Sequence, residues 1–214
     1  MNRRLALLVL PLLLAVAGCT SGTADDPAPR PAAAERPSPF RDCTGLSTAP
    51  TAASPGVGTA ASPGSSTATP KAGGQELPEL SLACFTGGSP ISLRDVAGPA
   101  VINVWASWCP PCRKELPAFQ RLSERTAGQL QVLGVNSRDS RGGAQSIGED
   151  FGVRFPILVD QGEALQRELK RNAIPLTLFV DADGRIRHID ASGALDDAQL
   201  AKLVRQHLGL AVPA

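Results

Sequence analysis

The stretch WASWCPPCRKELP, residues 105–117, holds two cysteines separated by two prolines, and it contains both tryptophans of the chain. The apolar, β-rich run AVINVWA at residues 100–106 leads into it and predicts a buried strand. Residues 110–126 carry large apolar side chains on one face, which predicts an amphipathic helix. Cys109 therefore lies where a buried strand gives way to a helix.

This position suits a reactive thiol. Cys109 falls at the N-cap of the predicted helix and Pro110 at its first position, where the missing proline N–H has no consequence. A sulfur at the N-cap faces unpaired backbone N–H groups and the positive end of the helix dipole, and both favour the thiolate. Cys112 lies one turn further along. The spacing predicts a two-step exchange, in which Cys109 attacks a target disulfide and Cys112 resolves the mixed disulfide.

Other uses of the two thiols are less consistent with the sequence. A zinc site needs about four ligands, but there is no second C-x-x-C pair and the histidines are His188 and His207 alone. A purely structural disulfide would gain little from closing so short a loop. A peroxidase is disfavoured because no T-x-x-C signature is present. We therefore expect redox chemistry with no metal and no cofactor other than the cysteine pair.

The rest of the chain predicts an α/β sandwich, because strands alternate with helices before a final hairpin and helix. The residues Ala182-Asp183-Gly184 signal the hairpin turn. The predicted strands are residues 77–85, 100–106, 130–136, 155–160, 176–181 and 185–190. The predicted helices are residues 110–126, 142–152, 163–170 and 196–208.

The N-terminus reads as a targeting segment. Arg3 and Arg4 precede an apolar run at residues 5–17, which is too short to span a bilayer comfortably. The run ends in VAGC, which resembles the lipobox of bacterial lipoproteins and implies cleavage after residue 18 and lipid attachment at Cys19. The alternative is an ordinary secretory signal with an incidental cysteine. Either interpretation places the mature protein outside the cytoplasm, where disulfides persist.

Residues 19–76 are dominated by Ala, Pro, Ser, Thr and Gly, and we expect a disordered linker there. Composition changes at Leu77, so we expect the folded domain at residues 77–214. The formal net charge is +1, from 21 basic and 20 acidic residues. This balance disfavours a nucleic-acid-binding protein, which usually has a basic excess.

Residues 101–117 resemble the active-site segment of membrane-anchored thioredoxin-like proteins of the TlpA/ResA type and their relatives in cytochrome maturation. The likeness extends from about residue 77 to residue 208. It implies a thioredoxin-like fold, with a central mixed β-sheet flanked by helices. It also implies an extra βα unit, which residues 142–160 can supply.

The resemblance also implies roles for individual residues. Cys109 matches the exposed nucleophile and Cys112 the buried resolving thiol. Glu115 matches an acidic residue under the redox pair, and Ile174-Pro175 matches a loop whose proline is cis and faces the disulfide. The sequence departs from the usual loop at Ala173, where glycine is common, so the shape of this loop is less closely specified.

Glu115 lies one helical turn from Cys112 and can take its proton during resolution. The alternative is a solvated glutamate that stabilises the first turns of the helix. Asn103 occupies the strand position where many thioredoxins carry a buried aspartate. Because an amide does no acid–base chemistry, Glu115 is the better candidate, and Asn103 is expected to hydrogen-bond inside the core.

The substrate side of the site is expected to comprise Trp108, Pro110, Pro111 and Ile174. The backbone of Ile174 can pair with an extended substrate segment. Trp105 is expected in the core. With Cys19 assigned to lipid, Cys43 and Cys84 remain, and we predict a structural disulfide between them in an oxidising compartment. The alternative is two free thiols.

Two directions of electron flow share this chemistry. As a reductant, the protein would accept electrons from an upstream membrane thiol donor and reduce disulfides in exported proteins such as apocytochromes c. As an oxidant, it would introduce disulfides into exported proteins. The resemblance favours the reductant. A third alternative is a non-catalytic thioredoxin-like binding module, which the intact cysteine pair disfavours.

Overall fold

The computed structural model describes residues 36–50 and 73–213, and its folded unit begins at Pro37. The predicted signal peptide at residues 1–18 and the predicted lipid-attachment residue Cys19 lie outside the described residues. Within the described residues, no helix is both long enough and apolar enough to cross a membrane.

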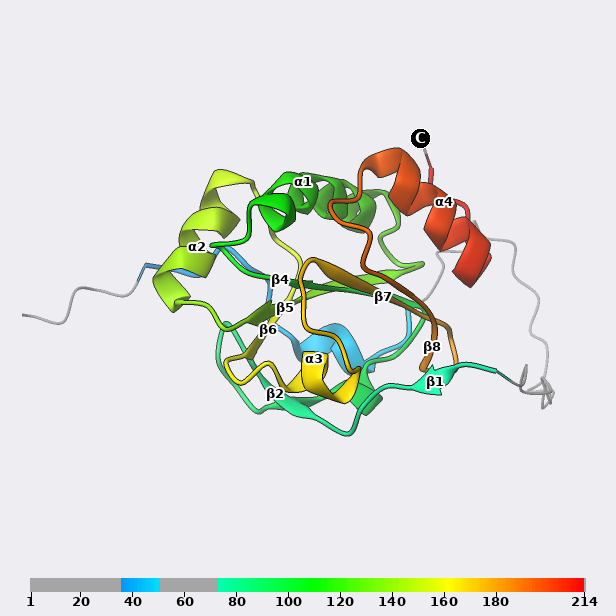
Figure 1. Cartoon of the computed structure of the whole chain (residues 1–214), viewed down its shortest axis with the longest axis horizontal. Coiled ribbons are helices and arrows are strands. Elements are labelled where there is room, and N and C mark those ends of the chain that lie inside the picture. The colour runs from blue at the N-terminus through cyan, green and yellow to red at the C-terminus, as the bar shows by residue number, and fades with distance from the viewer. Residues whose placement is uncertain (1–35, 51–72, 214) are drawn as a thin grey trace, which may run out of the picture. The chain divides into compact units, whose positions relative to one another are not determined.

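An eight-stranded mixed sheet forms the centre of this unit, in the order β1-β8-β7-β4-β5-β6-β2-β3 (Figure 1). β4, β5 and β6 are parallel to one another, whereas β7 is antiparallel to β4 and β8 to β7. The strands are β1 (Gln75–Glu76), β2 (Ser81–Cys84), β3 (Ile91–Ser92), β4 (Ala100–Trp105), β5 (Gln131–Ser137), β6 (Ile157–Asp160), β7 (Leu176–Val180) and β8 (Arg185–Asp190).

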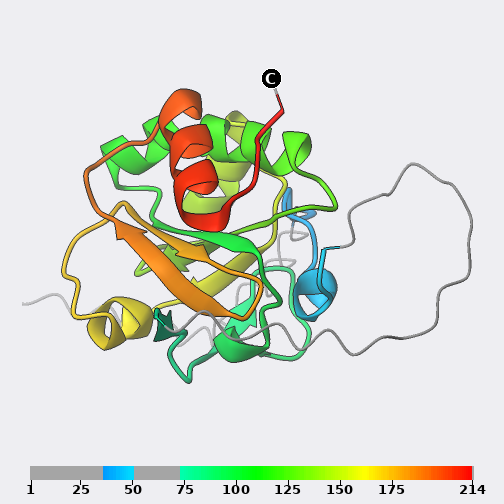
Figure 2. The same cartoon turned by 90° about the vertical axis from the view of Figure 1, so that its right-hand side faces the viewer.

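Helices cover both faces of the sheet. α1 (Pro110–Arg125), α2 (Arg141–Asp150) and α4 (Asp197–Leu208) lie on one face, and the short α3 (Ala164–Glu168) lies on the other (Figures 1 and 2). Two 3-10 turns, Thr44–Ser47 and Leu93–Asp95, complete the elements. The arrangement is the predicted thioredoxin-like α/β fold, and α2 with β6 supplies the predicted βα insertion.

β4 is buried along its whole length because it is a central strand covered on both faces. Its side chains alternate between two apolar clusters. Val101 and Trp105 belong to the cluster that contains residues of α1, and Ile102 and Val104 belong to the cluster on the other face. The continuous apolar run in the sequence therefore reflects two packed faces, and it anchors the strand from which the cysteine-bearing helix departs.

The folded unit begins earlier than the predicted boundary at residue 77. Residues 37–50, which we call the N-terminal strap, lie against the domain and are held by a disulfide from Cys43 to Cys84. Phe40 packs edge-on against Phe85, with ring centroids 4.8 Å apart. The side-chain amide of Gln131 donates to backbone carbonyls of the strap. The predicted linker at residues 19–76 thus contains a folded segment, because its few large apolar side chains and its cysteine find partners in the domain.

The strand predicted at residues 77–85 is shorter in the structure, where β2 covers Ser81–Cys84. The backbone turns before it, since the N–H of Leu80 donates to the carbonyl of Pro78. The two-residue edge strands β1 and β3 were not predicted, because two residues are too few to show an alternating pattern.

Candidate active site

The loop from residue 106 to 109, here called the redox loop, joins β4 to α1 beyond the carboxyl ends of the parallel strands β4 and β5. We call this end of the sheet the redox edge. Cys109 is the N-cap of α1, with extended backbone angles of φ −93° and ψ 105°. Pro110 and Pro111 occupy the first helical positions, where backbone N–H groups have no partner within the helix. The structure thus places Cys109 at the helix start, as the sequence predicted.

Cys109 and Cys112 form a disulfide whose Cα atoms lie 5.3 Å apart. The backbone N–H of Cys112 also donates a hydrogen bond of 3.3 Å to Sγ of Cys109. Because this N–H belongs to the unpaired first turn of α1, it can stabilise negative charge on the Cys109 sulfur after reduction. The positive end of the α1 dipole acts in the same direction.

Cys109 is less exposed than the family resemblance implies. Its exposed fraction is 3%, against 0% for Cys112. The reason is that both side chains belong to the apolar cluster that also contains Phe119 of α1. Cys109 is nevertheless more exposed than Cys112, as expected for the attacking thiol, although the difference in exposed fraction is small.

Asp139 holds the redox loop from the neighbouring strand, a role that the sequence did not indicate. Its carboxylate accepts hydrogen bonds from the backbone N–H and from the hydroxyl of Ser107, at 2.5 and 2.6 Å. It also accepts from the side-chain amide of Asn136 and from the N–H of Ser140. Asp139 follows β5, which is parallel to β4 and ends beside it. A polar residue just after the neighbouring parallel strand was the signal that could have identified it.

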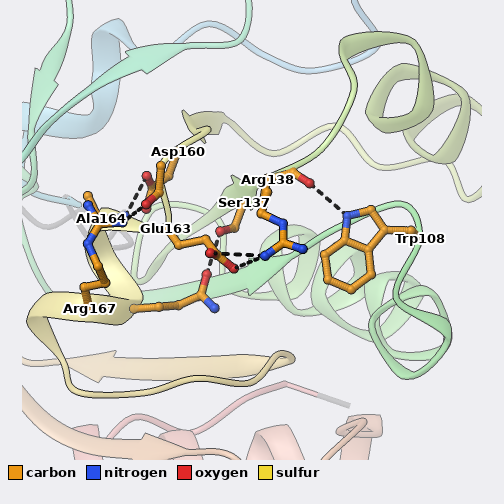
Figure 3. Close-up of polar contacts among 9 residues, drawn as sticks. Trp108, Ser137, Arg138, Asp160, Glu163, Ala164 and Arg167 are labelled. Atoms are coloured by element: carbon orange, nitrogen blue, oxygen red, sulfur yellow. Dashed lines mark hydrogen bonds and ion pairs between the residues drawn. The ribbon is translucent and has the colours of Figure 1, made fainter.

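Trp108 stands out of the surface beside Cys109, with an exposed fraction of 55%. Its indole N–H donates to the backbone carbonyl of Arg138 over 2.9 Å, so the ring is held although it is exposed (Figure 3). Pro110 is exposed and Pro111 is half-buried. These residues present the apolar surface expected of a docking site, whereas Trp105 is fully buried, as predicted.

Glu115 lies buried in α1, with an exposed fraction of 1%, rather than on the solvated face. One oxygen, Oε1, accepts a hydrogen bond of 2.7 Å from Nδ2 of Asn103. The other, Oε2, accepts a hydrogen bond of 3.0 Å from the backbone N–H of Leu195. Burial raises the pKa of Glu115 to about 7, although the two hydrogen bonds oppose the shift. A carboxyl group one turn from Cys112 is therefore poised to exchange a proton near neutral pH.

The peptide bond between Ile174 and Pro175 is cis, as expected. The next residue, Leu176, pairs with Val104 near the end of β4. Pro175 therefore lies at the same end of the sheet as the redox loop. Ile174 is half-buried and packs against the apolar cluster that contains both redox cysteines. The structure thus brings the predicted proline loop and the predicted cysteine pair to the redox edge.

The disulfide predicted between Cys43 and Cys84 is present, with Cα atoms 6.0 Å apart. Both residues are buried in the apolar cluster on the face away from α1. This disulfide joins the N-terminal strap to β2 and is separate from the redox pair, which lies in the other cluster.

Residues 73–189, more than half of the chain, match the model of the AhpC/TSA family. Among curated proteins, the thioredoxin-like protein YneN of Bacillus subtilis is 33% identical over 120 residues, which are 54% of this chain and 69% of YneN. A thiol:disulfide interchange protein DsbE homolog of Paracoccus denitrificans is 35% identical over 118 residues, which are 54% of this chain and 64% of that protein. The aligned segments thus leave part of each relative unmatched.

A solved structure of a DsbF homologue from Corynebacterium diphtheriae superimposes with a TM-score of 0.54 and 26% sequence identity. The superposition covers 61% of this chain and 85% of that one. The redox pair and the proline loop both fall within the segment that matches the family model. The chain therefore belongs to the AhpC/TSA family, where it is one of the thioredoxin-like proteins of the TlpA/ResA type.

Proposed function

We propose that this protein is a membrane-tethered thiol–disulfide oxidoreductase outside the cytoplasm, and that it reduces disulfides in exported proteins. The observation that carries the proposal is the arrangement at the start of α1. There the Sγ atom of Cys109 accepts the N–H of Cys112, and the buried carboxyl of Glu115 lies one turn further along. This arrangement supplies a stabilised thiolate, a resolving thiol and a proton acceptor.

In the first step, the thiolate of Cys109 attacks one sulfur of the substrate disulfide. A bond forms between that sulfur and Sγ of Cys109, and the substrate S–S bond breaks, so the second substrate sulfur leaves as a thiolate. Trp108, which precedes Cys109 in the chain, and Ile174, which packs against the apolar cluster of the redox pair, contact the substrate segment. The helix start favours Cys109 over Cys112 as the attacking group.

In the second step, Cys112 transfers its proton to the carboxylate of Glu115 and attacks Sγ of Cys109. The Cys109–Cys112 disulfide forms, the mixed disulfide breaks, and the substrate leaves with two thiols after it takes up protons. The two electrons come from the dithiol of the protein. A membrane thiol donor then reduces the Cys109–Cys112 disulfide, which resets the cycle.

The direction of electron flow and the substrate come from the TlpA/ResA resemblance. It favours reduction, with apocytochromes c among the exported substrates. The reverse direction, in which the disulfide of the protein oxidises substrate dithiols, uses the same residues. The reduction potential of the pair discriminates between the two.

The tether is proposed to be a lipid on Cys19, joined to the folded unit by the segment that precedes the N-terminal strap. The lipobox-like sequence at residues 16–19 supports it. Mass spectrometry of the protein from a membrane fraction tests this part. A diacylglyceryl group on an N-terminal Cys19 is expected, and an intact or differently cleaved N-terminus would contradict it.

Trapping tests the exchange chemistry. The Cys112→Ser variant is incubated with a peptide that contains an oxidised C-x-x-C-H motif, and adducts are mapped by mass spectrometry. A disulfide between the peptide and Cys109 is expected to accumulate, because no resolving thiol remains. The matched control is the double variant Cys109→Ser with Cys112→Ser, which should form none. If neither variant forms an adduct, the protein is a binding module rather than an oxidoreductase.

A further inference from the structure

Five exposed cations lie on the three segments that follow β4, follow β5 and precede β7, and we call this set the basic rim. Two of them follow Cys112 on α1, one follows β5, and two lie between α3 and the cis proline. The members of the basic rim are Arg113, Lys114, Arg138, Lys170 and Arg171, and all five are exposed.

The sheet register brings these segments to the redox edge. β4 and β5 run parallel and end side by side, and β7 begins opposite the end of β4. The segments after β4, after β5 and before β7 therefore meet there, beside the redox loop. The hydrogen bond from Trp108 to the carbonyl of Arg138 joins two of them directly, and Figure 3 shows the Arg138 side chain between Glu163 and Trp108.

Most acidic side chains at this edge are turned inward. Both oxygens of Asp160 accept backbone N–H groups at the start of α3 (Figure 3). Asp139 is bound to the redox loop, and Glu115 is buried in the core. Glu163 pairs with Arg138 at 3.4 Å, which leaves Glu168 as the exposed acid of α3. The surface that a substrate meets on this side is therefore basic.

The acids on the neighbouring β8–α4 segment are also engaged. Asp190 accepts hydrogen bonds from the N–H and the hydroxyl of Ser192. Asp196 caps α4, and Asp197 pairs with Arg121 at 2.6 Å. All three carboxylates therefore have partners within the protein, and the charge of Asp197 is neutralised by an arginine.

The members of the basic rim differ from several arginines elsewhere on the surface. Arg185 pairs with Glu76 and Arg187 with Asp181, in addition to the pair at α4. By contrast, within residues 36–50 and 73–213 the rim residues other than Arg138 form no ion pair. The rim residues thus belong to segments that converge at one end of the sheet, although the whole chain carries a formal net charge of only +1.

Unusual backbone angles occur at two residues of the basic rim. In the described part of the chain, three residues other than glycine have a positive φ, namely Arg138 at 47°, Glu163 at 54° and Lys170 at 54°. Two of the three belong to the basic rim, and the third is the ion-pair partner of Arg138. Lys170 follows α3 in a left-handed conformation that glycine adopts with less strain. Residues other than glycine are uncommon in this conformation, and they cluster at functional sites.

We propose that the basic rim selects substrates whose disulfide is flanked by Asp or Glu side chains. This inference rests on the proposed function, because it names the class of polypeptide that the redox pair serves. Acidic flanking residues would be drawn to the unpaired cations before the sulfur atoms meet. Such complementarity acts mainly on the rate of association and is weakened by salt.

Two synthetic peptides test the proposal. Each contains the same two-cysteine disulfide loop, flanked by Asp and Glu in one peptide and by Lys in the other. The second-order rate constant for their reaction with the reduced full chain is followed by tryptophan fluorescence. The acidic peptide is expected to react about tenfold faster or more at low ionic strength. The ratio should fall toward one at 1 M salt, where charges are screened beyond about 3 Å.

Charge reversal separates the rim from the net charge. Lys170→Glu with Arg171→Glu should lower the acidic-to-basic rate ratio by about tenfold or more. The matched control is Lys202→Glu with Arg205→Glu, which makes the same change in net charge on the exposed face of α4 and should leave the ratio close to that of the wild type. An unchanged ratio in the rim variant, or equal loss in both variants, would overturn the proposal.

The outcomes also separate this inference from the proposed function. If both peptides react at equal rates, the oxidoreductase chemistry stands and the acidic preference is rejected. If neither peptide reacts and no Cys109 adduct can be trapped, the proposed function fails and the substrate preference fails with it.

Discussion

Nδ2 of Asn103 lies 2.7 Å from Oε1 of Glu115 and donates a hydrogen bond to it in a part of the core that solvent does not reach. The opposite oxygen of the carboxyl group is held by Leu195. Because burial outweighs these two donors, the pKa of Glu115 rises to about 7. The redox helix thus carries a proton acceptor that is partly ionised at neutral pH, one helical turn from the resolving cysteine.

Glu115→Gln should slow resolution of the mixed disulfide and remove its pH dependence near neutrality. A carboxyl group acts as a base only when ionised, so in the wild type the resolution rate should rise with pH through about 7 and then level off. We expect a loss of about 10²-fold at pH 8, within the usual range for general-base catalysis. Rapid-quench measurement of the Cys109 mixed disulfide from pH 5 to pH 9 checks this.

The glutamine side chain fits the site. Its carboxamide oxygen can accept the hydrogen bond from the N–H of Leu195. The Oδ1 atom of Asn103 has no partner among the described residues, so after a flip of the Asn103 amide it can accept a hydrogen bond from the glutamine NH2 group. A Glu115→Gln profile that still rises through pH 7 at the wild-type rate would show that Glu115 is not the base.

Asn103→Ala should move the same pH profile to higher pH. The hydrogen bond from Asn103 lowers the pKa of Glu115, so its removal leaves the burial effect less opposed and raises that pKa further above its ordinary value. The resolution rate should therefore fall at pH 7 and recover at higher pH. A rate that falls equally at every pH would mean that the substitution only damages packing.

Asp139→Asn should both destabilise the fold and alter the redox pair. An amide nitrogen cannot accept hydrogen bonds, so some of the four donors on Asp139 lose their partner, at a cost of about 1–3 kcal/mol. Because two of those donors belong to Ser107 in the redox loop, the reduction potential should change as well. Urea unfolding and glutathione equilibration measure the two effects.

Ser140→Ala is the matched control for Asp139. It removes the side-chain cap of α2, where the hydroxyl of Ser140 accepts the N–H of Gly143, and should cost about 1 kcal/mol. It does not touch the redox loop, so its reduction potential should equal that of the wild type. If the reduction potentials of the two variants are equal, Asp139 stabilises the fold without affecting the redox pair.

Replacing both Cys43 and Cys84 by alanine should lower the free energy of unfolding by about 4 kcal/mol, given the sequence separation of 41 residues. The redox pair lies in the other apolar cluster, so its reduction potential should not change. Urea unfolding of the oxidised proteins supplies the comparison. If the variant unfolds with the same free energy as the wild type, the disulfide does not stabilise the attachment of the N-terminal strap.

Features that rest on local chemistry could be predicted from the sequence. The buried strand before Cys109, the proline-started helix and the cis bond before Pro175 follow from residues close together in the chain or from family resemblance. The βα insertion could be assigned because the family resemblance implies it and residues 142–160 can supply it.

Features that depend on distant partners could not be predicted as well. The residues around Phe40 give no sign that its ring packs against Phe85. The composition of residues 19–76 therefore predicts a linker where the structure has the N-terminal strap. Asp139 acts on Ser107 across two parallel strands, and this pairing needs the sheet register. The burial of Cys109 depends on the packing of α1 and not on the motif itself.

The reduction potential of the Cys109–Cys112 pair decides whether the protein reduces or oxidises disulfides in exported proteins. It is measured by equilibrating the full chain with glutathione or dithiothreitol buffers and titrating the free thiols. A reductant of exported disulfides should have a potential close to that of thioredoxin, about −270 mV. A value near that of strong periplasmic oxidants, about −120 mV, would mean that the protein forms disulfides and does not reduce them.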